Sequence, residues 1–277
     1  MLVVSNKKEK KMMNKKAALF HWIIFGVLAA LGIFLVTISD IDTGSRIKGE
    51  WQLNFLDNYY LEAEKDLLYI DQAAKIVVWQ TVLESAGNGG FITEGSCGNI
   101  SSYNLWNELN RWNECLPDIN KTISLKVKEG LAESLPNREY DDIKIDGNGI
   151  IGKGKKSSIL STSGKFVNYT YDTNFKVDLG FNIKTDYNIL RIEAVQLVDN
   201  CRNFDDLERC IKEKKKNNWK FKNCGVEEYR EDGKKVIFCV ESPQQAKIYN
   251  NTMVLVPLRY KFALDFSSID SSAYLIS

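Results

Sequence analysis

One apolar segment constrains this chain more than any other feature. Residues 17–38 contain no Lys, Arg, Asp or Glu, and no polar face divides them. Because a bilayer's hydrocarbon core takes about 20 helical residues to cross, the segment predicts an N-terminal transmembrane helix. It would separate a basic tail or leader, residues 1–16, from the much longer part of the chain that follows.

The charges beside this segment predict its direction. A single acid, Glu9, accompanies the lysines that precede it, which are Lys7, Lys8, Lys10, Lys11, Lys15 and Lys16. Excess Lys and Arg stays on the cytoplasmic side of a membrane. We therefore expect a single-pass plasma-membrane protein with an uncleaved signal anchor, a cytoplasmic N-terminus and an extracellular main domain. The lipid bilayer would be its first partner.

All the cysteines follow the apolar segment. An even number of cysteines on the exported side is typical of disulfides, and six buried free thiols are the alternative. Cys97 and Cys115 share one loop-rich stretch and are the expected pair. The remaining cysteines are Cys201, Cys210, Cys224 and Cys239. A turn at Asp232-Gly233 would offset Cys224 from Cys239, so we expect these strands to be linked to Cys201 or Cys210 rather than by a cross-strand Cys224–Cys239 bond.

Acceptor motifs for N-glycosylation, N-x-S/T, also follow the segment. They begin at Asn99, Asn120, Asn168 and Asn250. Their number is close to what chance gives in a chain this rich in Asn, Ser and Thr. The motifs therefore permit glycosylation without indicating it.

The start of the apolar segment resembles a known export signal. Lys15-Lys16-Ala17-Ala18-Leu19, followed by the apolar run, resembles the class III signal of archaeal pilins. In that family a prepilin peptidase cuts after a small residue that basic residues precede. The resemblance implies cleavage between Ala17 and Ala18, with Lys16 as the basic neighbour. It also implies an alternative to a permanent anchor, namely a processed pilin-like subunit of a surface filament.

A long amphipathic helix is predicted within residues 49–90, after a linker at 39–48. No proline and no internal glycine interrupts residues 50–86, and Gly87-Asn88-Gly89-Gly90 should end the helix. Apolar residues recur at steps of three and four, the spacing of a coiled-coil seam. They are Leu53, Leu56, Tyr60, Ala63, Leu67, Ile70, Ala74 and Val77.

The same helix has two interpretations. The seam could join a second copy of the chain as a homo-oligomer or filament. A wider stripe instead favours docking on the protein's own sheet, and Phe55, Tyr59, Leu68, Ile76 and Trp79 widen it. Both contacts can occur along different parts of the helix.

The last part of the chain, residues 140–277, reads as a β-rich head after a cysteine-containing loop and helix region at 91–139. Apolar residues alternate with polar ones over 175–183 and 254–266, and a further strand is expected over 191–198. Pro257 would place the last strand at an edge or at a bulge. Asn148-Gly149 and Asp232-Gly233 predict hairpin turns.

One short helix, residues 204–217 with Asn203 as its cap, is expected within this head. The fold class is therefore α+β: an N-terminal transmembrane helix, a long helix packed on a mostly antiparallel sheet, and loops tied by disulfides.

Catalytic signals are scarce. The one histidine, His21, lies in the apolar segment, so the rest of the chain cannot build a Ser-His-Asp triad or a histidine zinc site. No phosphate-binding or dinucleotide-binding glycine motif occurs. We expect no metal and no cofactor, and the net charge of +1 gives no indication of a nucleic-acid partner.

These observations predict a non-enzymatic, membrane-anchored surface protein with a structural, adhesive or assembly role and no ligand named by the sequence. The pilin-like subunit is one alternative. A carboxylate-dependent glycan-active enzyme is the other, because Asp141, Asp142 and Asp146 lie close together in the sequence. Acids beside a Gly-Asn-Gly turn are more often ordinary turn residues.

Overall fold

The computed structural model describes residues 24–37, 53, 55–109, 111–160, 168–220, 231–250 and 252–267. The chain forms two compact units, Met1–Ala63 and Glu64–Ser277.

The first unit contains two described helical stretches. Residues 24–37 are helical and exposed along their whole length. A π-helical turn, η1 (Phe55–Tyr60), leads into α2 (Leu61–Gly87), which continues into the second unit. The predicted tail at 1–16 and linker at 39–48 lie outside the described residues.

The predicted membrane span is wrong in this structure. No helix in the described part of the chain combines the length and the apolar character needed to cross a bilayer. Residues 17–23 and 38 lie outside the described residues. The predicted single-pass signal anchor and plasma-membrane location depend on this span, so these predictions are wrong as well.

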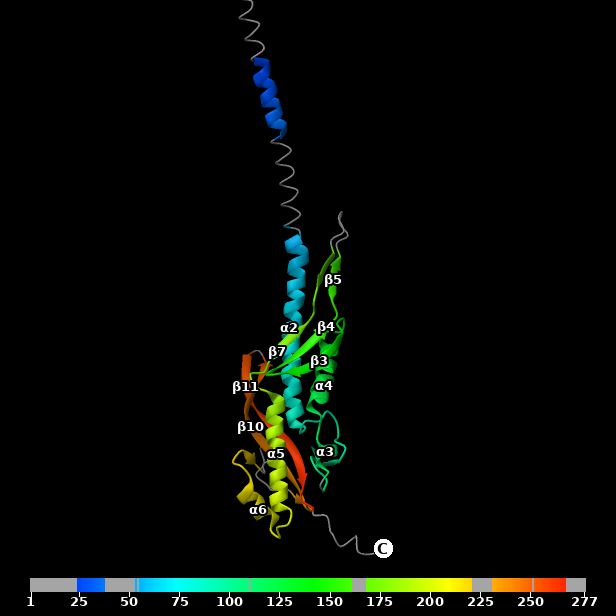
Figure 1. Cartoon of the computed structure of the whole chain (residues 1–277), viewed down its shortest axis with the longest axis vertical. Coiled ribbons are helices and arrows are strands. Elements are labelled where there is room, and N and C mark those ends of the chain that lie inside the picture. Colours follow the sequence, from blue (N-terminus) through cyan, green and yellow to red (C-terminus); the bar gives the residue numbers. More distant parts are fainter. Residues whose placement is uncertain are drawn as a thin grey trace, which may run out of the picture. The chain divides into compact units, whose positions relative to one another are not determined.

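Helix α2 runs lengthwise through the second unit (Figure 1). Its apolar residues Ile70, Ala74, Val78 and Val82 are buried in the main core. It ends at Gly87, as the sequence predicts. Beyond that end the backbone turns through left-handed glycines, and the Gly90 N–H donates to the Ser85 carbonyl at 2.7 Å.

A long hairpin provides the larger sheet. Strands β10 (Lys235–Asn250) and β11 (Thr252–Asp265) pair antiparallel, and β8 (Trp219–Lys220) and β9 (Glu231–Asp232) pair with β10. Strand β11 lies at the edge of this sheet. The register shifts between Glu241 and Gln245, and Gln245 lies opposite Pro257. The edge position and irregularity expected from Pro257 are both present.

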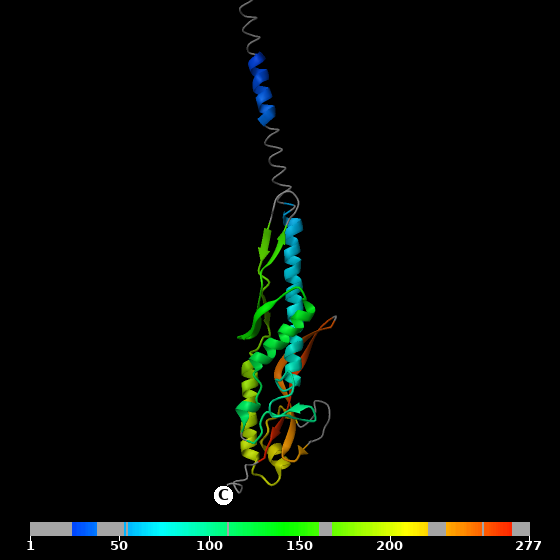
Figure 2. The same ribbon diagram turned by 90° about the vertical axis from the view of Figure 1, so that its right-hand side faces the viewer.

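Two smaller antiparallel groups complete the β structure of the head. Strands β3 (Tyr140–Asp146), β4 (Gly149–Gly154) and β7 (Phe175–Asp178) form one sheet in that order. Strands β5 (Ser157–Leu160) and β6 (Asn168–Tyr171) form a separate hairpin. Figures 1 and 2 show this hairpin toward the N-terminal end of α2 and the β10–β11 hairpin toward its C-terminal end.

Four further helices lie after α2 in the described chain. They are α3 (Trp112–Cys115), α4 (Ile119–Ser134), α5 (Ile183–Cys201) and α6 (Leu207–Lys214). Asp118 caps α4 by accepting a hydrogen bond from the Lys121 N–H at 3.1 Å, and Asn182 caps α5 in the same way. A short strand pair, β1 (Asn99–Ile100) and β2 (Tyr103–Asn104), precedes α3. The α+β class of the head agrees with the sequence.

Some predicted elements are different in the structure. The strand expected over 191–198 is part of α5, and the strand expected over 175–183 ends at Asp178. The Asn182 cap starts a helix there, and its buried residues recur at helical spacing. The short helix begins after Asp206, whose carboxylate accepts from the Arg209 N–H, rather than after Asn203.

Both hairpin turns are shifted by one residue from their expected positions. The turn residues are Gly147-Asn148 and Gly233-Lys234, because Asp146 pairs with Gly149 and Asp232 pairs with Lys235. The first turn residue has positive φ, +55° at Gly147 and +67° at Gly233. A two-residue turn with glycine in the first position explains the shift.

Candidate interaction surface

The cysteines form structural crosslinks. Cys97 pairs with Cys115, the pair expected from the sequence, and Cys201 pairs with Cys210. The turn between α5 and α6 brings the latter two Cα atoms to 5.7 Å. Because Cys201 and Cys210 pair with each other, the predicted links from the strands of Cys224 and Cys239 to these two cysteines are wrong. Cys239 is itself disulfide-bonded. Cys224 lies outside the described residues.

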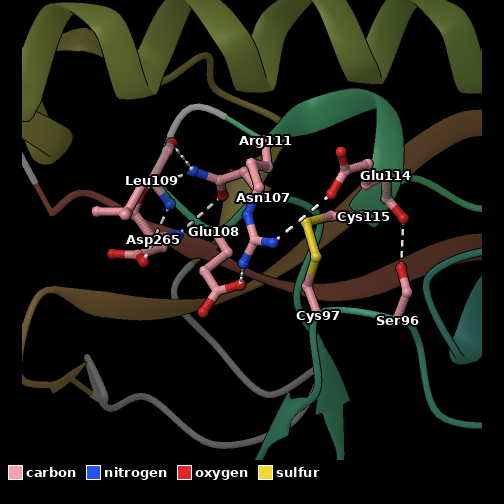
Figure 3. Close-up of polar contacts among 9 residues, drawn as sticks. All are labelled: Ser96, Cys97, Asn107, Glu108, Leu109, Arg111, Glu114, Cys115 and Asp265. Carbon is pink, nitrogen blue, oxygen red and sulfur yellow. Dashed lines mark hydrogen bonds and ion pairs between the residues drawn. A yellow bond between two sulfur atoms is a disulfide. The ribbon is translucent and has the colours of Figure 1, made fainter. Parts of the chain in front are cut away.

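Buried polar bonds join the Cys97–Cys115 loop to the end of β11 (Figure 3). The Asn107 amide is fully buried and donates to the Asp265 carbonyl at 2.6 Å. The Asp265 N–H donates back to Asn107 Oδ1 at 2.9 Å. Beside this pair, Trp106 stacks on Phe262 with ring centroids 3.7 Å apart. These contacts bring segments far apart in the sequence into one rigid region.

Further polar contacts lie across the same loop in Figure 3. Ser96 donates a hydrogen bond to the Glu114 carbonyl, next to the disulfide. Arg111 forms ion pairs with Glu108 and, at 3.6 Å, with Glu114. The exposed ion pairs contribute little to stability, so the disulfide and the Asn107–Asp265 bonds do most to fix the loop.

A half-buried carboxylate, Asp186, joins α5 to the large sheet. The Ser242 hydroxyl donates to it at 2.9 and 3.0 Å, and the Tyr260 hydroxyl donates at 3.0 Å. Burial raises the pKa of Asp186, and these two hydrogen bonds oppose the rise. Burial also raises the pKa of Tyr260. Hydroxyl groups from two strands thus hold the first turn of α5 in place.

A second carboxylate joins α2 to the β5–β6 hairpin. Asp66 pairs with Arg138 at 2.6 Å and accepts a hydrogen bond from the Tyr171 hydroxyl at 2.8 Å. Arg138 also donates to the Ser157 hydroxyl at 2.5 Å. The arrangement connects three segments of the chain.

Neither carboxylate belongs to a metal site, since no group of three or more His, Cys, Asp or Glu that could hold a metal ion occurs among the described residues. The acids that suggested a glycan-active enzyme, Asp141, Asp142 and Asp146, are exposed along β3. Asp142 lies 3.9 Å from the Lys144 ammonium in an exposed ion pair.

The predicted association seam is divided by the fold. Ile70, Ala74 and Val77 are buried in the head's own core. Of the other five, Ala63 is buried, Leu67 is half-buried, and the exposed ones are Leu53, Leu56 and Tyr60. Docking on the protein's own head therefore accounts for the C-terminal half of the seam.

A different stripe of α2 is accessible in the second unit. Leu68 and Ile76 are 61% and 40% exposed, and the exposed Gln72 lies between them. Leu83, farther along this side of the helix, is half-buried and packs against the core. Leu68 and Ile76 are among the residues that widen the seam in the sequence, whereas Trp79, another of them, is buried in the core. The accessibility of the stripe could not be read from periodicity, because it depends on which side of α2 the sheet covers.

The stripe leads into a groove between α2 and β10, with a volume of about 280 Å³. Ile76, Trp79, Leu83 and Ile248 form its apolar wall, and Glu84 and Lys247 supply charges. The Lys247 ammonium lies 5.9 Å from the Trp79 ring centroid, within cation–π range. Gln80 also lines the groove, so its wall is mixed, with four apolar side chains beside one amide and two charged groups.

The end of the β10–β11 hairpin extends this apolar surface. Val254 pairs in register with Ile248 of the groove. Met253, Val254 and Leu255 are consecutive and exposed, so both faces of the hairpin end present apolar side chains to solvent. Alternating strands normally expose only one such face.

The helix over 24–37 has the most exposed apolar surface of the described chain's helices, since its apolar side chains lie on every side of the axis. The exposed large ones are Ile24, Phe25, Val27, Leu28, Leu31, Ile33, Phe34, Leu35 and Val36. Large exposed apolar surfaces mark sites of association.

The predicted glycosylation acceptors are exposed wherever the structure describes their side chains. Asn99, Asn120 and Asn168 have exposed side chains. Asn250 ends β10, and its side chain is outside the described set. The processing residues Lys16, Ala17 and Ala18 lie outside the described residues as well.

No protein-family model, no curated protein and no solved structure matches this chain. The interpretation of its surface therefore rests on its own residues.

Proposed function

We propose that this protein is a non-enzymatic structural subunit that self-associates through apolar helical surfaces in an oxidising, exported environment. The observation that carries the proposal is the helix over 24–37, whose apolar side chains are exposed on all sides. Burying each such side chain gains roughly 1.5–3 kcal/mol. A chain that presents this much apolar surface has a strong drive to associate.

The crosslinked head supports a structural role. Its disulfides are typical of exported proteins, and its internal carboxylates, Asp66 and Asp186, are engaged by groups that join one element to another. The sole histidine of the sequence, His21, lies outside the head. These features favour a rigid module that is displayed by an assembling helix.

Light scattering coupled to size-exclusion chromatography tests the proposal on the full chain. Wild type should elute as assemblies well above its 31.6 kDa monomer mass. The double variant Leu28→Glu/Phe34→Glu should elute as a monomer. Ile192→Glu on α5, an equally exposed apolar position at 56%, is the matched control and should assemble like wild type. A monomeric wild type would refute the proposal.

A pilin-like filament subunit is the specific form that the Lys15–Leu19 resemblance favours. It requires removal of the lysine-rich leader, so the mature protein should begin at Ala18 when it is made in cells that contain a prepilin peptidase. N-terminal sequencing checks this. An intact lysine tail would exclude the pilin-like form and leave self-association to be judged by its own test.

A further inference from the structure

We propose that the folded head offers Asn168 as its N-glycosylation acceptor, with an oligosaccharide as the group that the side chain receives. The N-x-S/T motifs of the chain are alike in sequence, but the fold places them in different settings. The inference goes beyond the proposed function and shares with it only the exported environment, because such motifs are modified in secreted chains.

The Asn168 motif lies along β6 with its two essential side chains on the outer face. Alternation along the strand places Asn168 and Thr170 on one face, and both side chains are exposed. Tyr169 and Tyr171 lie on the other face, with their ring centroids 6.0 Å apart. Tyr171 is buried, and its hydroxyl donates to Asp66 of α2 at 2.8 Å. The asparagine and the threonine therefore point to solvent while the strand is held from behind.

The two groups that define the motif are also next to each other. The Thr170 hydroxyl donates to Asn168 Oδ1 at 3.5 Å. A hydrogen bond this long is weak, so both groups can exchange it for contacts with an enzyme. The amide and the hydroxyl are thus presented together, as the motif requires.

The surroundings of β6 leave room for an enzyme and for a sugar. Of the described strands, only β5 pairs with β6. Ser158 of β5 lies opposite Thr170 and is exposed as well, so the outer face has small polar side chains there. A two-stranded hairpin is marginally stable by itself, which lets β6 separate locally from β5 and enter an enzyme's peptide groove.

The Asn120 motif has the opposite setting. It lies in the first turn of α4, where the Thr122 N–H donates to the Asp118 carbonyl at 2.8 Å. Thr122 is only 8% exposed, and its neighbours Ile119 and Ile123 belong to the main core. An enzyme would have to unwind α4 to reach the threonine hydroxyl. The folded head therefore withholds this motif although the Asn120 side chain is exposed.

The Asn99 motif is held in a tight turn. Its hydroxyl residue, Ser101, has a positive φ of +48°, a conformation that residues other than glycine keep only where the surrounding structure imposes it. Cys97, two residues before Asn99, is fixed by its disulfide to Cys115. This motif is therefore less able than the β6 motif to adapt to an enzyme.

Glycosylation of the folded full chain in vitro tests the proposal. Oxidised protein is incubated with a purified single-subunit oligosaccharyltransferase and a chitobiose-linked lipid donor. Peptide-N-glycosidase in isotope-labelled water then marks each occupied asparagine, and mass spectrometry follows tryptic peptides 166–176 and 112–121, which contain Asn168 and Asn120. Occupancy of 166–176 should rise at least about tenfold faster, because unwinding α4 exposes Ile123 and that cost alone corresponds to such a factor.

Matched variants and an unfolded sample complete the test. Thr170→Ala should abolish modification of Asn168, Thr170→Ser should retain it, and Ser158→Ala, opposite Thr170 but outside the motif, should leave it unchanged. In reduced, denatured protein both peptides should be modified at similar rates, since the fold no longer distinguishes them.

The outcomes separate this inference from the proposed function. An unmodified Asn168 in folded protein, or equal rates for the two peptides before and after denaturation, would overturn the assignment and leave self-association standing. Assembly is measured on protein without the sugar, so a monomeric wild type would refute self-association and leave Asn168 as the acceptor.

Discussion

Two apolar helical regions of this chain differ in how far they are buried. Helix α2 turns an apolar side to the head's own core, which covers Ile70, Ala74 and Val78. The helix over 24–37 is apolar on every side and remains exposed. An amphipathic helix can bury its apolar side within one chain, because one apolar surface of the same chain is enough to cover that side. A helix without a polar side needs surroundings on all sides, which makes association the natural consequence.

The largest expected effect is a loss of stability that follows a substitution in the head but not one in the exposed helix. Trp106→Ala should lower the free energy of unfolding of the head by about 3–5 kcal/mol. Trp106 is fully buried, stacks on Phe262 and donates to the Gly89 carbonyl at 2.9 Å. Urea denaturation followed by circular dichroism measures the change. Leu28→Ala in the exposed helix should leave the head's unfolding unchanged, and an equal loss in both variants would contradict the comparison.

Removing a disulfide should have the next largest effect, and it sharpens the account of how the head is fixed. The Cys97→Ser/Cys115→Ser variant should lose about 3 kcal/mol, and the Cys201→Ser/Cys210→Ser variant about 2.5 kcal/mol, because the longer loop restrains the unfolded chain more. The sequence separations are 18 and 9 residues. Thermal unfolding of both double variants tests the order. A larger loss for the shorter loop would show that native contacts, rather than loop entropy, dominate.

Asp186→Asn should give a smaller effect that depends on pH. Burial raises the pKa of Asp186 in the folded state above its ordinary value of 3.8. The folded state therefore holds the proton more tightly than the unfolded chain, and this contribution is complete below pH 3.8 and is lost as pH rises through the folded pKa. The asparagine cannot titrate, so the variant should compare more favourably with wild type at pH 7 than at pH 4. Urea titrations at the two pH values measure this, and a difference that does not change with pH would contradict it.

Local signals predict part of this fold. Gly87-Asn88-Gly89-Gly90 does end α2, and the alternating residues before Asp265 do form β11. Cys97 and Cys115 are close in sequence and pair as expected. Each of these features depends on neighbouring residues, so periodicity and turn chemistry suffice to find them.

Features that depend on competition or on distant partners could not be predicted. Residues 183–201 include alternating stretches, yet the Asn182 cap and helical burial make them α5. Asn107 and Asp265 are 158 positions apart, and nothing local pairs them. The sequence likewise does not show which side of α2 stays accessible, because the packing of the whole head decides which side the core covers. The prediction of a membrane span rests on the apolar composition of residues 17–38, and composition does not show where a helix begins and ends.

Electron microscopy of the full-length wild-type protein tests the central claim most directly. The account predicts assemblies of several copies, and their loss in Leu28→Glu/Phe34→Glu. Isolated single particles of wild type at every concentration would contradict it.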